Sequence, residues 1–154
     1  MLAGYRAKRA LTVVLVPLMG GCVATRSVDV GVGVVPAPSP HPYEPDIPLP
    51  VGFILADQSS EEWASGSLRY VRHCYRGPGG AETRLGVRRF YRQQMPLVRW
   101  APLAESDVHG RCTMSFERET ESCVITIAHE RRAFTQSVVV TVLITPIARK
   151  LVDR

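Results

Sequence analysis

The second half of the chain consists of four apolar-rich runs. They are residues 98–105, 111–118, 122–130 and 133–145, and Pro146 ends the last run. The two middle runs alternate apolar and polar residues with a period of two, which places successive side chains on opposite faces of a strand, so the pattern predicts four β-strands. Because only short polar turns separate them, consecutive strands are expected to pair antiparallel.

The hairpin formed by residues 111–130 has a register that its turn determines. A two-residue turn at 119–120 places Phe116 opposite Cys123. The same register collects six side chains on one face: Cys112, Met114, Phe116, Cys123, Ile125 and Ile127. Cys112 and Cys123 are then about 13 Å apart along the strands. A mutual disulfide is excluded, because it needs Cα atoms within about 7 Å.

A period of 3.6 residues predicts a helix over residues 81–95. Its two stripes are Val87, Tyr91 and Met95 on the apolar side and Arg84, Arg88 and Arg92 on the opposite side. Pro96 is expected to end the helix, because proline has no backbone N–H. Gly86 costs about 1 kcal/mol relative to alanine inside a helix, and we interpret it as allowing a close approach between the helix and the sheet.

Two shorter strands are predicted before the helix, at residues 52–56 and 68–75. The whole pattern predicts one domain of the α+β class over residues 51–146. In this domain a single helix packs on one face of an antiparallel β-sheet. Residues 147–154 then form a C-terminal tail.

The last predicted strand is apolar on both faces, although a sheet face in water normally carries more charge. Val139 and Leu143 lie on the face opposite to the one expected to meet the helix, next to Val124. Two explanations remain open. Either the segment around Phe53 and Leu55 covers this face, or the face is an exposed patch that binds a partner.

The first 22 residues combine a basic start, an apolar run and a cysteine. Three basic residues precede the apolar run 10–19, and two glycines lead directly to Cys22. The run is too short to span a bilayer. The pattern resembles the lipobox of bacterial lipoproteins, which implies that residues 1–21 are removed and that Cys22 is acylated and anchors the chain to a membrane. The alternative is an ordinary signal peptide, in which residues 22–24 stand in for the A-x-A cleavage pattern.

This resemblance implies a location in the cell envelope. Val23 follows the cysteine where lipoproteins kept at an inner membrane commonly carry aspartate, so we expect the outer membrane, facing the periplasm. Residues 22–50 are then the lipidated cysteine and a disordered tether. Seven prolines between residues 36 and 50 favour extended polyproline II in this segment.

The positive charge of the chain belongs largely to its leader. The formal net charge of +5 falls to +2 when the three basic residues of the leader are removed. We therefore expect no nucleic-acid partner. Residues 66–99 nevertheless hold eight arginines against one glutamate. The stripe of Arg84, Arg88 and Arg92 is thus a candidate site for a lipid headgroup or an anionic cell-wall polymer, unless it pairs with the acidic residues of 100–130.

Three cysteines remain after Cys22, in a compartment where disulfides persist. Cys74 is expected to pair with Cys112 or Cys123, or else all three are buried thiols. The histidines and cysteines lack the paired spacing of metal-ligand motifs, so no metal or other cofactor is expected. His73 and Cys74 are neighbours on a predicted strand, where their side chains point to opposite faces. The chain is therefore not expected to be an enzyme.

Several landmarks occur together along residues 50–146. They are Gly66, Leu68, Arg69 and Tyr70, then Tyr75-Arg76-Gly77, Phe90-Tyr91 with Met95-Pro96, Trp100, Gly110 to Arg118, and Cys123 to Ile127. The set resembles a group of uncharacterised small bacterial lipoproteins and secreted proteins, in which a helix of F-Y-x-x-x-M form leads into a tryptophan-bearing strand. The resemblance implies an envelope protein with a binding or structural role, with an envelope protein as its partner. It implies no catalytic residues.

Overall fold

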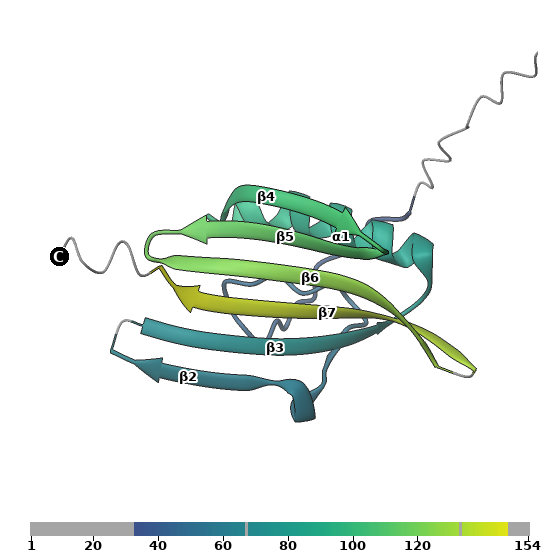
Figure 1. Cartoon of the computed structure of the whole chain (residues 1–154), viewed down its shortest axis with the longest axis horizontal. Coiled ribbons are helices and arrows are strands. Elements are labelled where there is room, and N and C mark those ends of the chain that lie inside the picture. The colour runs from purple at the N-terminus through teal and green to yellow at the C-terminus, as the bar shows by residue number, and fades with distance from the viewer. Residues whose placement is uncertain (1–32, 67, 133, 148–154) are drawn as a thin grey trace, which may run out of the picture.

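The described part of the chain forms one seven-stranded sheet and one α-helix. A computed structural model describes residues 33–66, 68–132 and 134–147 (Figure 1). Its elements are β1 (Ile54–Leu55), the 3₁₀ helix η1 (Asp57–Ser59), β2 (Glu61–Ser65), β3 (Leu68–Pro78), α1 (Ala81–Leu97), β4 (Ala101–Val108), β5 (Arg111–Arg118), β6 (Glu121–Arg132) and β7 (Thr135–Pro146). The strand order is β1-β3-β7-β6-β5-β4, β2 also pairs with β3, and all pairs are antiparallel. The predicted combination of one helix and an antiparallel sheet is thus confirmed, although the sheet contains a strand, β2, that was not predicted.

The predicted register of the β5–β6 hairpin is confirmed. Phe116 pairs with Cys123, and Cys112 pairs with Ile127. β6 continues into a longer hairpin with β7, whose register runs from the pair Glu121–Pro146 to the pair Arg132–Thr135. These three strands form the centre of the sheet.

α1 extends two residues beyond its predicted end and shifts the strand that follows. Pro96 lies inside the last turn of the helix. Arg99 then turns the chain with a φ of 68°, so β4 begins at Ala101 and not at residue 98. Trp100, between the two elements, is fully buried.

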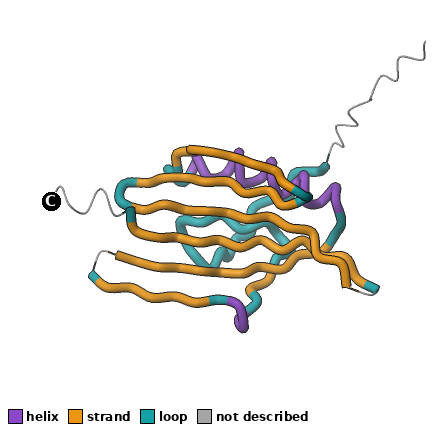
Figure 2. The backbone as a smooth tube through the Cα atoms, in the orientation of Figure 1, coloured by secondary structure: helices purple, strands orange, loops and turns teal. Residues whose placement is uncertain are grey.

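The sheet has one buried face, which we call the inner face, and an opposite outer face. Its buried side chains alternate along each strand with outer-face residues. Those of the inner face are Val71, Tyr75, Cys112, Met114, Phe116, Cys123, Ile125, Ile127, Val138, Val140, Val142 and Ile144, each at most 2 % exposed. α1 contacts β6 and β4, and Figure 2 shows the helix and a loop segment behind the strands.

The prediction that residues 22–50 form a disordered tether is wrong for residues 33–50, which we call the N-terminal segment. Ile47 and Leu49 are only 2 % and 3 % exposed and belong to the core. The N–H of Ser39 donates to the carbonyl of Leu49 at 2.7 Å, so the segment folds back on itself. The prolines prevent a regular ladder, but the residues between them still pack and form hydrogen bonds. The domain therefore begins before residue 51, while residues 22–32 lie outside the described residues.

Gly86 does allow a close approach to the helix, but by the N-terminal segment and not by the sheet. A Cβ atom at Gly86 would lie 2.1 Å from the carbonyl oxygen of Val34. A Cβ atom at Gly33 would likewise lie 2.4 Å from the carbonyl oxygen of Glu82. The backbone of the N-terminal segment therefore packs directly against the backbone of α1.

We expect Gly86→Ala to destabilise the domain by about 1–3 kcal/mol because of overpacking. This sign is opposite to the intrinsic preference of a helix, in which alanine is better than glycine by about 1 kcal/mol. Urea denaturation measures the change, and Gln93→Ala at an exposed helix position is the control that should have little effect. Higher stability in Gly86→Ala would mean that the N-terminal segment does not pack on the helix.

The position of Phe53 decides between the two explanations for the second apolar face. The ring of Phe53 lies on the inner face, where a Cβ atom at Gly77 would be 2.5 Å from it. Leu55 pairs with an inner-face residue of β3. The segment therefore does not cover Val139 or Leu143, and the covering explanation is wrong. Figure 1 looks onto the outer face, and no described segment crosses in front of its strands.

Candidate functional site

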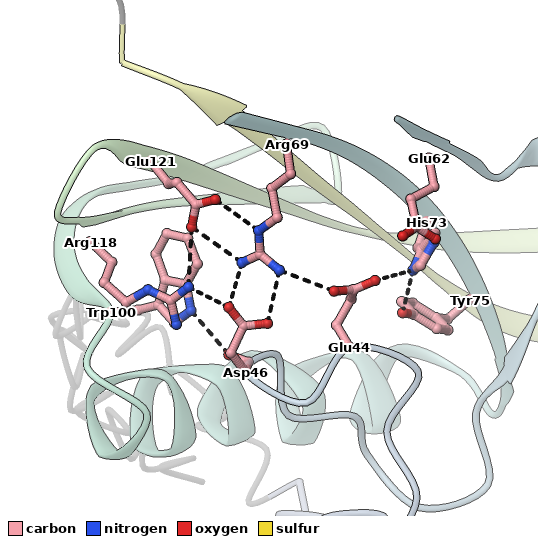
Figure 3. Close-up of polar contacts among 9 residues, drawn as sticks. All are labelled: Glu44, Asp46, Glu62, Arg69, His73, Tyr75, Trp100, Arg118 and Glu121. Atoms are coloured by element: carbon pink, nitrogen blue, oxygen red, sulfur yellow. Dashed lines mark hydrogen bonds and ion pairs between the residues drawn. The ribbon is translucent and has the colours of Figure 1, made fainter. Parts of the chain in front are cut away.

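Charged side chains gather on the inner face, at the end of the sheet where β3 and β6 begin (Figure 3). Arg69 of β3 lies at the centre. Its guanidinium donates to Glu44 at 3.1 Å, to Asp46 at 3.2 Å and to Glu121 at 2.8 Å. Arg118 of β5 also donates to Asp46 and, at 3.1 Å, to Glu121. We call these five residues the arginine cluster.

The arginine cluster joins the N-terminal segment to the sheet. Glu44 and Asp46 belong to that segment, whereas the other three members belong to β3, β5 and β6. Trp100 also helps to hold the N-terminal segment, because its indole N–H donates to the backbone carbonyl of Asp46 at 3.0 Å. The guanidinium of Arg118 lies 4.4 Å from the centre of the Trp100 ring, within the range of cation–π attraction. Charge-assisted hydrogen bonds of this kind stabilise more than neutral ones, so the cluster has a structural role.

The two carboxylates of the N-terminal segment have opposite pKa shifts. Burial raises the pKa of Asp46, but hydrogen bonds from Arg69 and Arg118 outweigh burial and hold the pKa below its usual range. Burial also raises the pKa of Glu44, and the attraction of Arg69 offsets only part of that rise. Asp46 is therefore held as an anion, while Glu44 takes up a proton more readily than an ordinary glutamate.

Glu44, Glu62 and His73 form a second group, beside the arginine cluster, that could hold a metal ion. One ligand atom of each residue lies within 4.8 Å of the other two. His73 Nδ1 lies 3.0 Å from the hydroxyl of Tyr75 and 4.0 Å from Glu44, and its Nε2 lies 3.9 Å from Glu62. Burial lowers the pKa of His73, which favours the neutral ring that a metal requires.

This group fits a metal ion only loosely. Zinc bonds of about 2.0–2.2 Å place neighbouring ligand atoms about 3.4 Å apart, so the side chains would have to move closer together. Glu44 also accepts a hydrogen bond from Arg69, which competes with a cation for the same carboxylate. The expectation that the chain binds no metal stays a prediction.

The predicted arginine stripe on α1 is present, and acidic residues of β4 pair with it. Arg84 donates to Asp107 at 2.8 Å, and Arg92 donates to Glu105 at 2.6 Å. Arg88 donates to both carboxylates. Burial raises the pKa of Glu105, but hydrogen bonds from Arg92 and Arg88 outweigh burial and lower it. An anionic ligand would have to displace these carboxylates, so the structure agrees with the alternative in which the stripe pairs within the domain.

The predicted disulfide from Cys74 to Cys112 or Cys123 is wrong. All three are free thiols. Cys112 and Cys123 are buried on the inner face, whereas Cys74 lies between the inner-face residues His73 and Tyr75 and therefore points to the outer face. Burial raises the pKa of Cys123 to about 12, so its thiol is not a nucleophile at neutral pH.

The sequence alone did not reveal the arginine cluster, because its members are far apart along the chain. Arg69 is 25 residues from Glu44 and 52 residues from Glu121. One cue was present: Glu44 and Asp46 are the only acidic residues among the prolines of 36–50. Cys22, the predicted lipidation site, lies outside the described residues.

Comparisons of the chain with protein-family models, curated proteins and solved structures gave no match. In the part of the chain that the structure describes, no helix has the length and apolar character needed to cross a membrane. A function therefore has to be argued from the geometry of the residues themselves.

Proposed function

We propose that this chain is a lipid-anchored protein of the cell envelope with a non-enzymatic binding role. The support for the anchor is the basic start, the apolar run and the two glycines before Cys22. Val23, in place of aspartate, favours the outer membrane, with the domain facing the periplasm. The proposed partner is another envelope protein.

The observation that carries the binding role is the open outer face of the sheet. A row of small hydroxyl and thiol side chains crosses five strands there: Cys74, Thr141, Thr126, Thr113 and Ser106. The aliphatic residues Val124, Val139 and Leu143 lie beside this row. Arg72 and Arg76 of β3 flank it, opposite Leu143 and Val139, and their charges pair with Glu61 and Glu130. A broad face with an uncharged centre favours a protein partner, because small ligands bind mostly in concave pockets.

We also propose that α1 and the N-terminal segment together cover the inner face, so that the outer face is the one available to a partner. Four apolar side chains of the helix, Val87, Phe90, Tyr91 and Met95, are fully buried, which supports this arrangement. The arginine cluster holds the N-terminal segment in place on the same side. A partner would then meet a sheet that is already rigid.

The inner face supports a non-enzymatic role. The carboxylates of the arginine cluster pair with arginines, and burial raises the pKa of Cys112 as well as that of Cys123. The alternative function, an anionic-ligand module that uses Arg84, Arg88 and Arg92, loses support because these side chains already donate to carboxylates of β4.

Photo-crosslinking in living cells tests the proposal. A photo-reactive phenylalanine analogue at Thr141 is expected to give a discrete crosslinked product in the membrane fraction. The same analogue at Gln93, an exposed position of α1, is the control and should give none. Leu143→Lys is expected to remove the product without unfolding the domain, because a lysine on an open face can extend its charge into water.

The anchor has its own variant. Cys22→Ser is expected to release the protein from the membrane or to leave an uncleaved precursor.

The two parts of the proposal can fail separately. Recovery of the wild-type chain as a soluble protein would contradict the anchor. Equal crosslinking from Thr141 and Gln93, or an undiminished product from Leu143→Lys, would contradict the binding face.

A further inference from the structure

The β6–β7 hairpin projects beyond the rest of the sheet. β5 pairs with β6 only as far as Ala128, and β3 pairs with β7 only from Ser137 onward. The pairing of β6 with β7 nevertheless continues to Arg132 and Thr135. Figure 1 shows this hairpin extending past the neighbouring strands, at the end of the sheet opposite to the one where β3 and β6 begin. Within the described residues, the end of this hairpin therefore has no neighbouring strand on either side.

The tip of this hairpin combines an aromatic side chain with arginines. Phe134 is fully exposed, and Arg131 and Arg132 precede it and are exposed as well. Glu130 is shared between Arg132 and Arg76, at 3.1 Å and 2.9 Å. With Arg131, the tip thus carries more positive than negative charge. Burial of a large apolar side chain such as phenylalanine is favourable. A partner that accepts both an aromatic ring and positive charge would therefore bind here.

The start of the described chain lies at the same end of the molecule. Gly33 and Val34 pack against the first turns of α1, next to Glu82 and Gly86. α1 follows β3 directly, so these turns lie where β3 ends and where the β6–β7 hairpin projects (Figure 1). Val34 itself is 86 % exposed.

The length of chain before Gly33 limits how far this end can lie from a membrane. Gly33 follows Cys22 by eleven positions, and a fully extended chain of that length reaches at most about 40 Å. An acylated Cys22 would therefore keep this end of the domain toward the bilayer. Val108, 57 % exposed, ends β4 at this same end and adds a further apolar side chain there.

We propose that the tip of the β6–β7 hairpin is a second membrane contact, in which Phe134 enters the interface of a bilayer and Arg131 and Arg132 bind the phosphates of anionic lipids. Aromatic and basic side chains together are the composition that binds such an interface. The inference rests on the proposed lipid anchor. It places the long strands upright on the membrane, and this orientation leaves the outer face of the sheet accessible from the side.

Fluorescence quenching in vesicles tests the contact. The full-length chain is produced in bacteria, and its acylated form is purified from membranes and reconstituted into vesicles of phosphatidylcholine and phosphatidylglycerol. A fraction of the lipids carries bromine near the top of the acyl chains, because a side chain in the interface lies about 5–10 Å deep. Trp63 and Trp100 emit as well, so the spectrum of the wild-type chain is subtracted from that of each variant. In Phe134→Trp, the added indole at the tip is expected to be blue-shifted and to lose most of its emission to brominated lipid. Leu103→Trp is the matched control, since Leu103 is 60 % exposed near the opposite end of β4, and its emission should be unaffected.

The anionic part of the contact has its own variant. Arg131→Gln, made together with Phe134→Trp, is expected to reduce the quenching in vesicles that contain phosphatidylglycerol and to have little effect in pure phosphatidylcholine. Arg72→Gln is the control, because it removes the same positive charge from a half-exposed side chain of β3, outside the hairpin. It should leave the quenching unchanged in both kinds of vesicle.

Flotation of the vesicles separates the two possible failures. A chain that floats and shows equal quenching at positions 134 and 103, or none at either, overturns the membrane contact but leaves the anchor standing. A wild-type chain that does not float overturns the anchor and the contact with it.

Discussion

Arg69→Met is expected to lower the free energy of unfolding by about 3 kcal/mol, the loss typical of removing one partner from a buried ion cluster. The Arg69 side chain is only 23 % exposed, and it forms ion pairs with three carboxylates. After the substitution, Arg118 still pairs with Asp46 and Glu121, whereas Glu44 loses its arginine partner in the cluster. The mutual repulsion of the carboxylates, and not the loss of one hydrogen bond, sets the size of the effect.

Urea denaturation at neutral pH measures this loss, and a neighbouring residue provides the control. Arg72 lies on the same strand, is 50 % exposed, and approaches Glu61 only to 3.9 Å. Arg72→Met is therefore expected to cost less than about 1 kcal/mol. The deficit of Arg69→Met should shrink as the pH is lowered toward 4, because protonation removes the repulsion between the carboxylates. Similar losses for the two variants would mean that the arginine cluster does not hold the N-terminal segment.

The parts of the fold that the sequence predicted correctly are those set by local pattern. The register of the β5–β6 hairpin follows from a two-residue turn and strict alternation, and both depend on residues close together in the chain. α1 was found for the same reason, from its 3.6-residue period. β2 was missed, because Glu61–Ser65 is exposed throughout and has no apolar alternation.

The parts that the sequence did not predict depend on contacts between distant residues. Ile47 and Leu49 are core residues only because the sheet and the helix offer them a surface, and the prolines around them indicate only that no regular element forms. For the stripe containing Arg88, the sequence left open an anionic ligand or pairing with the acidic residues of 100–130, and only the position of β4 beside the helix identifies Glu105 as a partner. The arginine cluster likewise exists only once the N-terminal segment, β3 and β6 have been brought together.

The two carboxylates of the N-terminal segment are expected to respond to neutralisation in opposite directions. At neutral pH, Asp46→Asn should lower the free energy of unfolding by about 2 kcal/mol, because it weakens charge-assisted hydrogen bonds from Arg69 and Arg118. Glu44→Gln should leave the free energy unchanged or raise it. The amide oxygen of glutamine can still accept the hydrogen bond from Arg69, while the repulsion from Glu62 and the cost of burying a charge disappear.

The pH dependence of the two variants distinguishes their causes. The folded state lowers the pKa of Asp46, so Asp46 contributes stability above its unfolded pKa of about 3.9, and this contribution is lost as the pH falls toward the folded pKa. The folded state raises the pKa of Glu44, so its contribution is present below the unfolded pKa of about 4.3 and is lost as the pH rises through the folded value. The deficit of Asp46→Asn should therefore vanish in acid, and so should any gain from Glu44→Gln. Equal losses for both variants at neutral pH would mean that Arg69 stabilises the two carboxylates alike, and that burial of Glu44 carries no cost.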